Sequence, residues 1–108
     1  MSYNVITFRS FEKQAKRLIK KYPSLKNELA LLIKSLQLEP KQGTSLGANC
    51  FKIRLAISSK GKGKSGGARI ITHIHYSEET VILLSMYDKA EQSNISDVAI
   101  TELLKFIY

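Results

Sequence analysis

Five side chains that can bind a phosphate or transfer a proton lie on the predicted strands or just beyond their ends. Lys52 and Arg54 alternate with apolar residues along one strand. Arg69 opens the next strand, and Tyr87 and Lys89 close the last one. In an antiparallel sheet these ends can converge into a concave cationic cluster. Because arginine offers a planar fork to phosphate and a crowded lysine loses its proton readily, such a cluster can grip RNA phosphates and move protons at a ribose 2′-hydroxyl.

Alternating polar residues also have a simpler interpretation. One face of a half-exposed sheet is commonly polar without any chemical role. On this interpretation Lys52 and Arg54 face solvent only because their apolar neighbours face the core. The alternation alone does not decide between a cationic site and an ordinary exposed face.

The segment from Ser59 to Gly67 holds four glycines and three lysines in nine residues. Lys60, Lys62 and Lys64 can each neutralise a phosphate, so we expect salt-dependent RNA binding from this segment. Its end resembles a phosphate loop, but the first glycine of that motif is missing and a strand follows instead of a helix. Nucleotide triphosphate binding is therefore excluded, and a solvated hairpin tip stays open as the alternative.

His73 and His75 lie two residues apart, on one face of a predicted strand, a spacing that metal sites sometimes use. No Cys, Asp or Glu cluster near them in the sequence supplies a third ligand, and the single cysteine, Cys50, is remote in the chain. We therefore expect no metal and no other cofactor. The two histidines are interpreted as ordinary sheet residues or, as for His73, as peripheral RNA contacts.

Basic residues are concentrated in the first two thirds of the chain. Residues 1–69 contain 15 Lys and Arg against 3 Asp and Glu, a net charge of +12, whereas residues 70–108 carry a net charge of −4. A positive field attracts phosphate backbones and acidic partners and accelerates their encounter. A solvated basic surface without a nucleic-acid partner is the alternative.

Two amphipathic helices are predicted near the beginning of the chain. Apolar residues recur at helical spacing over 11–22 and 25–36. Ser10 and Ser24 are the expected N-caps, and Pro23 ends the first helix. The two helices therefore form a hairpin whose apolar stripes need a sheet to pack against.

Period-two and apolar segments predict that sheet. We expect strands over 5–8, 51–57, 68–76 and 81–87. The segment 39–50 is predicted as a loop, and a final helix follows Asn94 or Ser96 and ends near Phe106. This order predicts an α+β fold in which an N-terminal strand and a helical hairpin pack on a small antiparallel sheet, with a short C-terminal helix and all helices on one face.

The length of 108 residues fits one domain, 1–108. One cysteine cannot form an internal disulfide, which is typical of a reducing compartment. No apolar run approaches the roughly 20 residues that span a bilayer, and the N-terminus does not look like a secretory signal. We therefore expect a cytoplasmic protein.

Taken together, the motifs resemble the RelE/ParE toxin superfamily and most closely the HigB-type branch of RelE-like toxins. The resemblance rests on Phe51–Ala56, on Lys60–Ile71, on Leu83–Glu91 and on the helical pattern over 11–38. These segments cover nearly the whole chain. Within the third of them, Asp88 would place a negative charge beside the cationic cluster.

This resemblance implies the toxin of a type II toxin–antitoxin pair with a RelE-like fold. Such toxins are metal-independent endoribonucleases, or mRNA interferases, that cut mRNA in the ribosomal A site and so inhibit translation. In the family reaction a ribose 2′-hydroxyl attacks the adjacent phosphate. The products are a 2′,3′-cyclic phosphate and a free 5′-hydroxyl.

The resemblance also implies a role for each member of the cationic cluster. Lys52 matches a general base or charge stabiliser, and Arg54 and Arg69 match clamps on the transition state. Tyr87 matches a residue that stacks on or orients a base, and Lys89 matches a group that assists the leaving oxygen.

The partners implied by the resemblance are a cognate antitoxin, the 30S A site of the ribosome and mRNA, with no membrane. The antitoxin is expected to be a helix-turn-helix protein from an adjacent gene. Two alternatives stay open. A ParE-like toxin with the same fold would poison DNA gyrase, although chains of that type usually lack the cationic set. A non-catalytic RNA- or ribosome-binding relative is the other alternative, which composition does not exclude.

Overall fold

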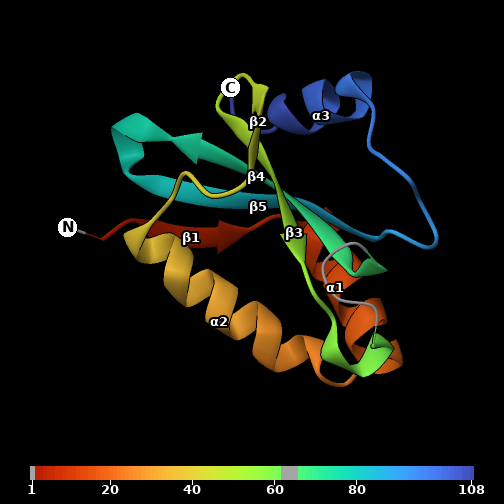
Figure 1. The fold of residues 1–108 in the computed structure, drawn as a ribbon. Helices are drawn as coiled ribbons and strands as arrows, with labels where there is room; N and C mark the ends of the chain where they lie inside the picture. Colours follow the sequence, from red (N-terminus) through yellow and green to blue (C-terminus); the bar gives the residue numbers. More distant parts are fainter. Residues whose placement is uncertain (1, 62–65) are drawn as a thin grey trace.

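The computed structural model describes residues 2–61 and 66–108, and in this part of the chain three α-helices pack on one five-stranded sheet (Figure 1). The helices are α1 (Arg9–Lys21), α2 (Leu25–Leu38) and α3 (Asp97–Leu104). The strands are β1 (Asn4–Thr7), β2 (Thr44–Gly47), β3 (Cys50–Leu55), β4 (Ala68–His75) and β5 (Thr80–Asp88). The single-turn 3₁₀ helices η1 (Ser58–Lys60) and η3 (Tyr76–Glu78) precede β4 and β5, respectively.

The sheet has the spatial order β1-β5-β4-β3-β2. β1 runs parallel to β5, and the other three pairs of neighbouring strands are antiparallel. The helical hairpin of α1 and α2 connects β1, at one edge of the sheet, to β2, at the other edge. The predicted α+β fold, with its N-terminal strand, helical hairpin and C-terminal helix, is confirmed.

α1 and α2 cover one face of the sheet. Their buried stripes include Leu18, Leu25 and Leu36, all without exposed surface, and these pack against sheet residues such as Ile70 and Met86. This is the apolar spacing that the sequence shows over 11–22 and 25–36. The main core therefore lies between the hairpin and the sheet.

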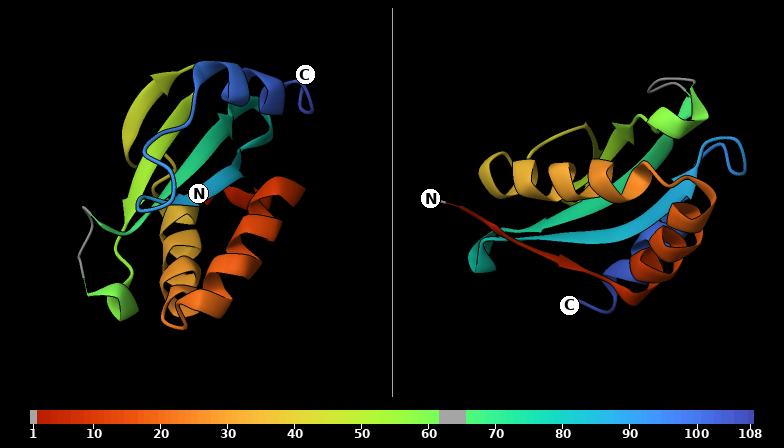
Figure 2. Two further views of the ribbon diagram at one scale, coloured as in Figure 1. Left: turned by 90° about the vertical axis from the view of Figure 1, so that its right-hand side faces the viewer. Right: turned by 90° about the horizontal axis from the view of Figure 1, so that it is seen from below.

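α3 packs on the opposite face, so the prediction of all helices on one face is wrong. Ile100 of α3 joins a second core cluster with Ile71 and Leu84 of the sheet. Figure 2 shows α3 on one side of the sheet and α1 and α2 on the other. The reason is visible in β4 and β5, whose residues are buried at nearly every position on both faces, so that the sheet needs two covering layers.

β2 lies inside the segment that the sequence predicts as a loop. It pairs with β3, with Thr44 opposite Lys52 and Gly47 opposite Cys50. Only one of its four residues, Leu46, is strongly apolar, so β2 lacks the period-two pattern of a buried strand. Backbone pairing across a tight turn, and not side-chain burial, specifies this edge strand.

The helix caps agree only partly with the sequence. α1 begins at Arg9, and the hydroxyl of Ser10 donates a hydrogen bond to the carbonyl oxygen of Leu84 instead of capping the helix. Ser24 does occupy the N-cap of α2, although its side chain makes no capping hydrogen bond. Ser96 caps α3 by accepting a hydrogen bond from the N–H of Ala99. Among the described helices, none combines the length and the apolar character that crossing a membrane requires.

Two leucines of α2 give a direct test of the packing. We expect Leu36→Ala to lower the free energy of unfolding by about 2–5 kcal/mol, because Leu36 is fully buried and its loss leaves a cavity. Leu38→Ala is the matched control, since Leu38 is 75% exposed and its loss should change the free energy by less than about 0.5 kcal/mol. Urea unfolding followed by circular dichroism measures both values. Equal losses in the two variants would contradict this packing.

Candidate functional site

Three of the predicted site residues lie in one row across three neighbouring strands. In the sheet register Arg54 of β3 is opposite Arg69 of β4, and Arg69 is opposite Tyr87 of β5. Directly opposite residues of an antiparallel pair have Cβ atoms about 4.5–5.5 Å apart. Lys52 precedes Arg54 by two residues and therefore shares its face. The structure thus brings these four side chains together.

This row, which we call the Arg54–Arg69–Tyr87 row, faces the side of the sheet that carries α3. The next row consists of Ile53, Ile70 and Met86 and packs in the core beneath α1 and α2. Successive strand residues point to opposite faces. The cationic row therefore lies away from the helical hairpin, and Tyr87 contributes to the second core cluster together with Ile100 of α3.

Exposure changes along the row. Arg54 is exposed and Lys52 is partly exposed, whereas Arg69 and Tyr87 are only 5% and 4% exposed. The row therefore runs from the surface at β3 into the interior at β5. The sequence predicts a concave cationic cluster, and the structure differs because Arg69 and Tyr87 are buried, with Tyr87 in the core cluster that contains Ile100 of α3.

The buried end of the row combines a cation with an uncharged phenol. Burial raises the pKa of Tyr87 above its ordinary value, and the nearby charge of Arg69 only partly offsets this effect. Tyr87 is therefore a neutral hydrogen-bond donor at pH 7. Its hydroxyl is buried and has no hydrogen-bond partner among the described residues. Arg69 donates from Nη1 to the carbonyl oxygen of Ala68 at 3.2 Å.

Lys89 lies beyond the end of β5, outside the row. Its side chain is exposed, and its Nζ donates to the carbonyl oxygen of Ser93 at 3.2 Å. Its backbone N–H donates to Gly67 at 3.1 Å, which ties the segment after β5 to the beginning of β4.

Lys60 occupies a different position from the exposed phosphate contact expected from the sequence. Its Nζ lies 2.6 Å from Oδ1 of Asp88, and the two side chains are only 7% and 0% exposed. The ion pair neutralises the charge of Lys60, so the structure does not offer this lysine to a phosphate. Lys62 and Lys64, the other lysines of the predicted RNA-binding segment, lie outside the described residues.

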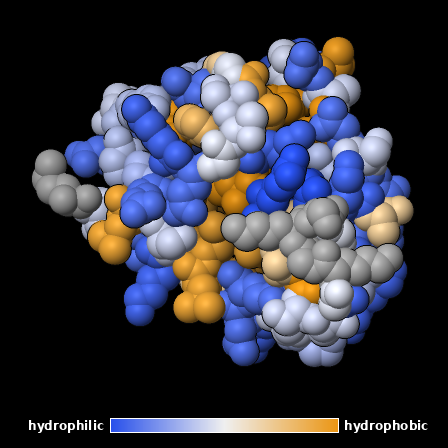
Figure 3. Space-filling model, viewed as in Figure 1, coloured by the Kyte–Doolittle hydropathy of each residue, from blue (hydrophilic) through white to orange (hydrophobic). Residues whose placement is uncertain are grey.

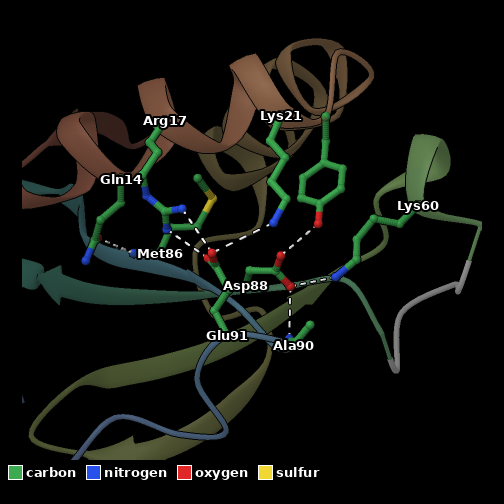
Figure 4. Close-up of polar contacts among 9 residues, drawn as sticks. Gln14, Arg17, Lys21, Lys60, Met86, Asp88, Ala90 and Glu91 are labelled. Carbon is green, nitrogen blue, oxygen red and sulfur yellow. Dashed lines mark hydrogen bonds and ion pairs between the residues drawn. The ribbon is translucent and has the colours of Figure 1, made fainter.

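Asp88 points away from the Arg54–Arg69–Tyr87 row, toward α1. Tyr22 donates to its Oδ2 at 3.0 Å, and the N–H of Ala90 donates to its Oδ1 at 2.9 Å (Figure 4). Burial alone would raise the pKa of this carboxyl group, but the hydrogen bonds from Lys60, Ala90 and Tyr22 lower it below its ordinary value. The negative charge expected beside the cationic cluster is therefore on the other face of the sheet and already paired.

The sequence does not predict this polar cluster. The one available signal is that alternation places Asp88 on the core side of its strand, where a carboxylate needs a partner. The sequence does not predict which residue pairs with Asp88, because many lysines precede Lys60 in the chain. A second, exposed part of the cluster joins Glu91 to Arg17 at 2.9 Å and to Lys21 at 3.9 Å (Figure 4).

His73 is buried, with 1% of its surface exposed, and both of its ring nitrogens have neighbours. Nδ1 lies 3.4 Å from Sγ of Cys50, and Nε2 lies 2.7 Å from the hydroxyl of Tyr108. The structure does not bring His73 to the surface, where an RNA contact would require it. Cys50, remote in sequence, is directly opposite His73 in the sheet.

A third metal ligand is missing beside Cys50 and His73. In the described part of the chain, no three His, Cys, Asp or Glu side chains group closely enough to hold a metal ion. Burial raises the pKa of the Cys50 thiol to about 11, which keeps it protonated at neutral pH.

A groove of about 700 Å³ runs between α2 and the edge of β3. Lys52 and Arg54 border it, and Leu31 and Leu32 contribute an apolar wall. Figure 3 shows hydrophobic surface exposed on this side of the molecule among largely hydrophilic side chains. α2 carries two exposed large hydrophobic residues, Leu31 and Leu38. The cationic row thus adjoins an apolar groove at its exposed end.

The fold and the row define a class of protein: a small α+β domain with cationic side chains gathered on one sheet face. The family model described as the RelE toxin of the RelE/RelB toxin–antitoxin system matches residues 5–106. The chain therefore belongs to the RelE toxin family, whose members pair with an antitoxin. The RelE part of the resemblance seen in the sequence is confirmed.

Solved RelE structures share the fold. A mutant of the E. coli toxin RelE in the free state matches with a TM-score of 0.66 and 16% identity, covering 100% of both chains. The toxin–antitoxin complex RelBE2 from Mycobacterium tuberculosis matches with a TM-score of 0.56 and 18% identity, covering 83% of this chain and 94% of that one. The intact E. coli RelBE complex matches with a TM-score of 0.51 and 18% identity, over 81% and 96% of the two chains.

The buried position of His73 predicts a pH-dependent stability. Burial lowers the pKa of His73, only partly opposed by its backbone hydrogen bond with Ala48, and the charge of His75 lowers it further. Below about pH 6.5 the imidazole of His73 is protonated in the unfolded chain but stays neutral in the folded chain. The free energy of unfolding should therefore fall on acidification by at most about 1.4 kcal/mol per pH unit. This loss should end at the folded pKa.

Urea unfolding between pH 7.5 and 5 measures the slope, and NMR of the imidazole Cε1–H measures the pKa of His73 itself. His73→Gln is the control, because it should remove this part of the slope. A folded-state pKa at or above 6.5 would contradict the burial of the ring.

Proposed function

We propose that the protein is a ribosome-dependent mRNA endoribonuclease, the toxin of a type II toxin–antitoxin pair. The observation that carries the proposal is the register of Arg54, Arg69 and Tyr87, with Lys52 on the same face. Two guanidinium groups in adjacent strands would stabilise the negative charge that develops on a phosphate undergoing substitution. Membership of the RelE toxin family supports this interpretation.

In the proposed reaction, the 2′-oxygen of a ribose attacks the adjacent phosphorus and the bond to the 5′-oxygen breaks. The proton leaves the 2′-hydroxyl, and another proton reaches the departing 5′-oxygen. Lys52 acts as the base or as a charge stabiliser, while Arg54 and Arg69 hold the phosphate oxygens. No metal ion takes part, because the positive side chains supply the stabilising charge.

Tyr87 fits a donor that orients the RNA. RNA binding in this proposal must expose the Tyr87 hydroxyl, which is buried and has no partner among the described residues; a hydrogen bond to a bound ribose, phosphate or base would then remove a cost of about 1–3 kcal/mol. Lys89 assists the leaving oxygen in this proposal, and its exposed side chain can leave Ser93 to do so.

Dependence on the ribosome follows from the small number of positioning groups. A nuclease that works by charge stabilisation needs its RNA held in line, and the A site supplies that geometry. The basic residues of the first 69 positions would dock on ribosomal RNA as well as on the message. The antitoxin, a helix-turn-helix protein from an adjacent gene, would cover the same surface in the cytoplasm.

The segment Leu83–Glu91 supports assignment to the HigB-type branch within the RelE toxins. We treat residues 1–108 as a single RelE-like domain, in keeping with the family match over 5–106. A ParE-like gyrase poison is the second candidate, and the retained cations Lys52, Arg54 and Arg69 count against it. A non-catalytic relative would bind RNA or the ribosome through the same surface but would not cleave the message.

Arg54→Ala tests the proposed site without disturbing the core, because Arg54 is exposed. We expect cleavage of mRNA on programmed ribosomes to fall about 10²–10³-fold, as for the loss of one preorganised donor. Lys34→Ala is the matched control for the loss of one positive charge, since Lys34 is an exposed cation on α2 whose loss weakens the general attraction to ribosomal RNA but removes no donor from the row. Primer extension on the message gives the cleavage rate and position.

Three results would overturn the proposal. Intact mRNA together with arrested gyrase would favour the ParE-like candidate. Ribosome binding without cleavage by the wild-type protein would favour the non-catalytic relative. Equal cleavage by Arg54→Ala and Lys34→Ala would remove the cationic row from the reaction.

A further inference from the structure

The carboxylate of Asp88 joins three segments of the chain beneath the sheet. Lys60 comes from η1, Tyr22 follows the end of α1, and Ala90 belongs to the turn after β5. All three donate to Asp88, whose side chain is fully buried (Figure 4). We call this group the Asp88 cluster. It uses both carboxylate oxygens and leaves neither exposed.

The Asp88 cluster lies directly behind the proposed RNA site. Asp88 is the residue after Tyr87 and pairs with Ala68, which precedes Arg69. One row of the sheet therefore belongs to the cluster, and the adjacent row carries Arg69 and Tyr87 on the opposite face. A shift of the Asp88 backbone would move Tyr87 with it, since the two share a peptide unit.

We propose that Asp88 is a positioning residue for the RNA site. Its ion pair with Lys60 and its hydrogen bond from Tyr22 fix the end of β5 and so hold Tyr87 in register with Arg69. This proposal rests on the proposed function. Two charges buried together are costly, and apolar residues of similar size commonly serve stability as well or better. A geometric role at the strand end gives such a pair a purpose that apolar packing would not meet.

The structure also offers a comparison for this role. Glu91 makes ion pairs with Arg17 and Lys21 only three residues from Asp88, but its side chain is 39% exposed. Exposed ion pairs contribute little to stability. The ion pairs of Glu91 are therefore not expected to fix the end of β5. Glu91→Gln therefore removes a neighbouring negative charge without touching the contacts of Asp88.

The experiment compares Asp88→Asn, Tyr22→Phe and Glu91→Gln at a temperature at which circular dichroism shows every variant folded. Cleavage on programmed ribosomes gives kcat and KM, and NMR hydrogen exchange gives the protection of the Arg69 and Tyr87 amides. We expect Asp88→Asn to lower kcat about 10- to 100-fold with little change in KM, as small misplacements of catalytic groups do. Tyr22→Phe should lower kcat severalfold, and Glu91→Gln should behave as wild type.

Exchange of the Arg69 and Tyr87 amides should quicken in Asp88→Asn and not in Glu91→Gln. Wild-type kcat and wild-type protection in folded Asp88→Asn would overturn the proposal, as would an effect confined to KM. If Asp88→Asn does not fold, Tyr22→Phe decides, because it removes one hydrogen bond and leaves the ion pair. If the wild-type protein cuts no mRNA, the proposed function fails, and hydrogen exchange alone decides whether Asp88 positions the strand ends.

Discussion

A charge in the interior of a protein needs a partner, and the centre of this sheet is buried on both faces. β5 lies between β1 and β4, and every residue from Val81 to Asp88 is buried. The carboxylate of Asp88 is tolerated there only because Lys60, Tyr22 and the N–H of Ala90 bond to it. Meeting this requirement connects the helical hairpin, the turn before β4 and the end of β5.

The same double burial shapes the opposite face of the strand. Tyr87 points toward α3, where desolvation keeps it neutral, and Arg69 beside it is the buried cation of the row. α3 packs over the β5 end of the row. Arg54 lies on β3, nearer the opposite edge of the sheet, and is exposed. The row therefore combines one accessible guanidinium with two groups held by the surrounding core. The accessible end of the row is thus at Arg54, and its buried end is at Tyr87.

Periodicity in the sequence was sufficient for most of the fold. The helical spacing of Leu18, Leu25 and Leu36 and the alternation around Ile53 correspond to buried stripes in the structure. β2 could not be predicted, because an edge strand held by backbone pairing carries no apolar pattern. The face chosen by α3 also escaped prediction, since a strand apolar on both faces gives no signal for where a particular helix packs.

The sequence predicts which residues make up the candidate site, but not how deeply each is buried or which groups surround it. Alternation places Arg54 on the face opposite Ile53, but only the register shows Arg69 and Tyr87 directly in line with it. Pairing of charges depends on tertiary distance, so Lys60 in its glycine-rich segment looked like a solvated cation and is instead the buried partner of Asp88.

Groups that weaken a fold while serving no contact within it are expected at functional sites. The Tyr87 hydroxyl, buried and without a partner among the described residues, is such a group, whereas the equally buried Asp88 carboxylate is fully bonded. The two neighbours on β5 thus differ: the carboxylate of Asp88 has hydrogen-bond partners on both oxygens, whereas the hydroxyl of Tyr87, on the opposite face, retains unused hydrogen-bonding capacity. In the proposed nuclease, this asymmetry would allow the packing of the protein to align donors for an RNA that the ribosome holds in place.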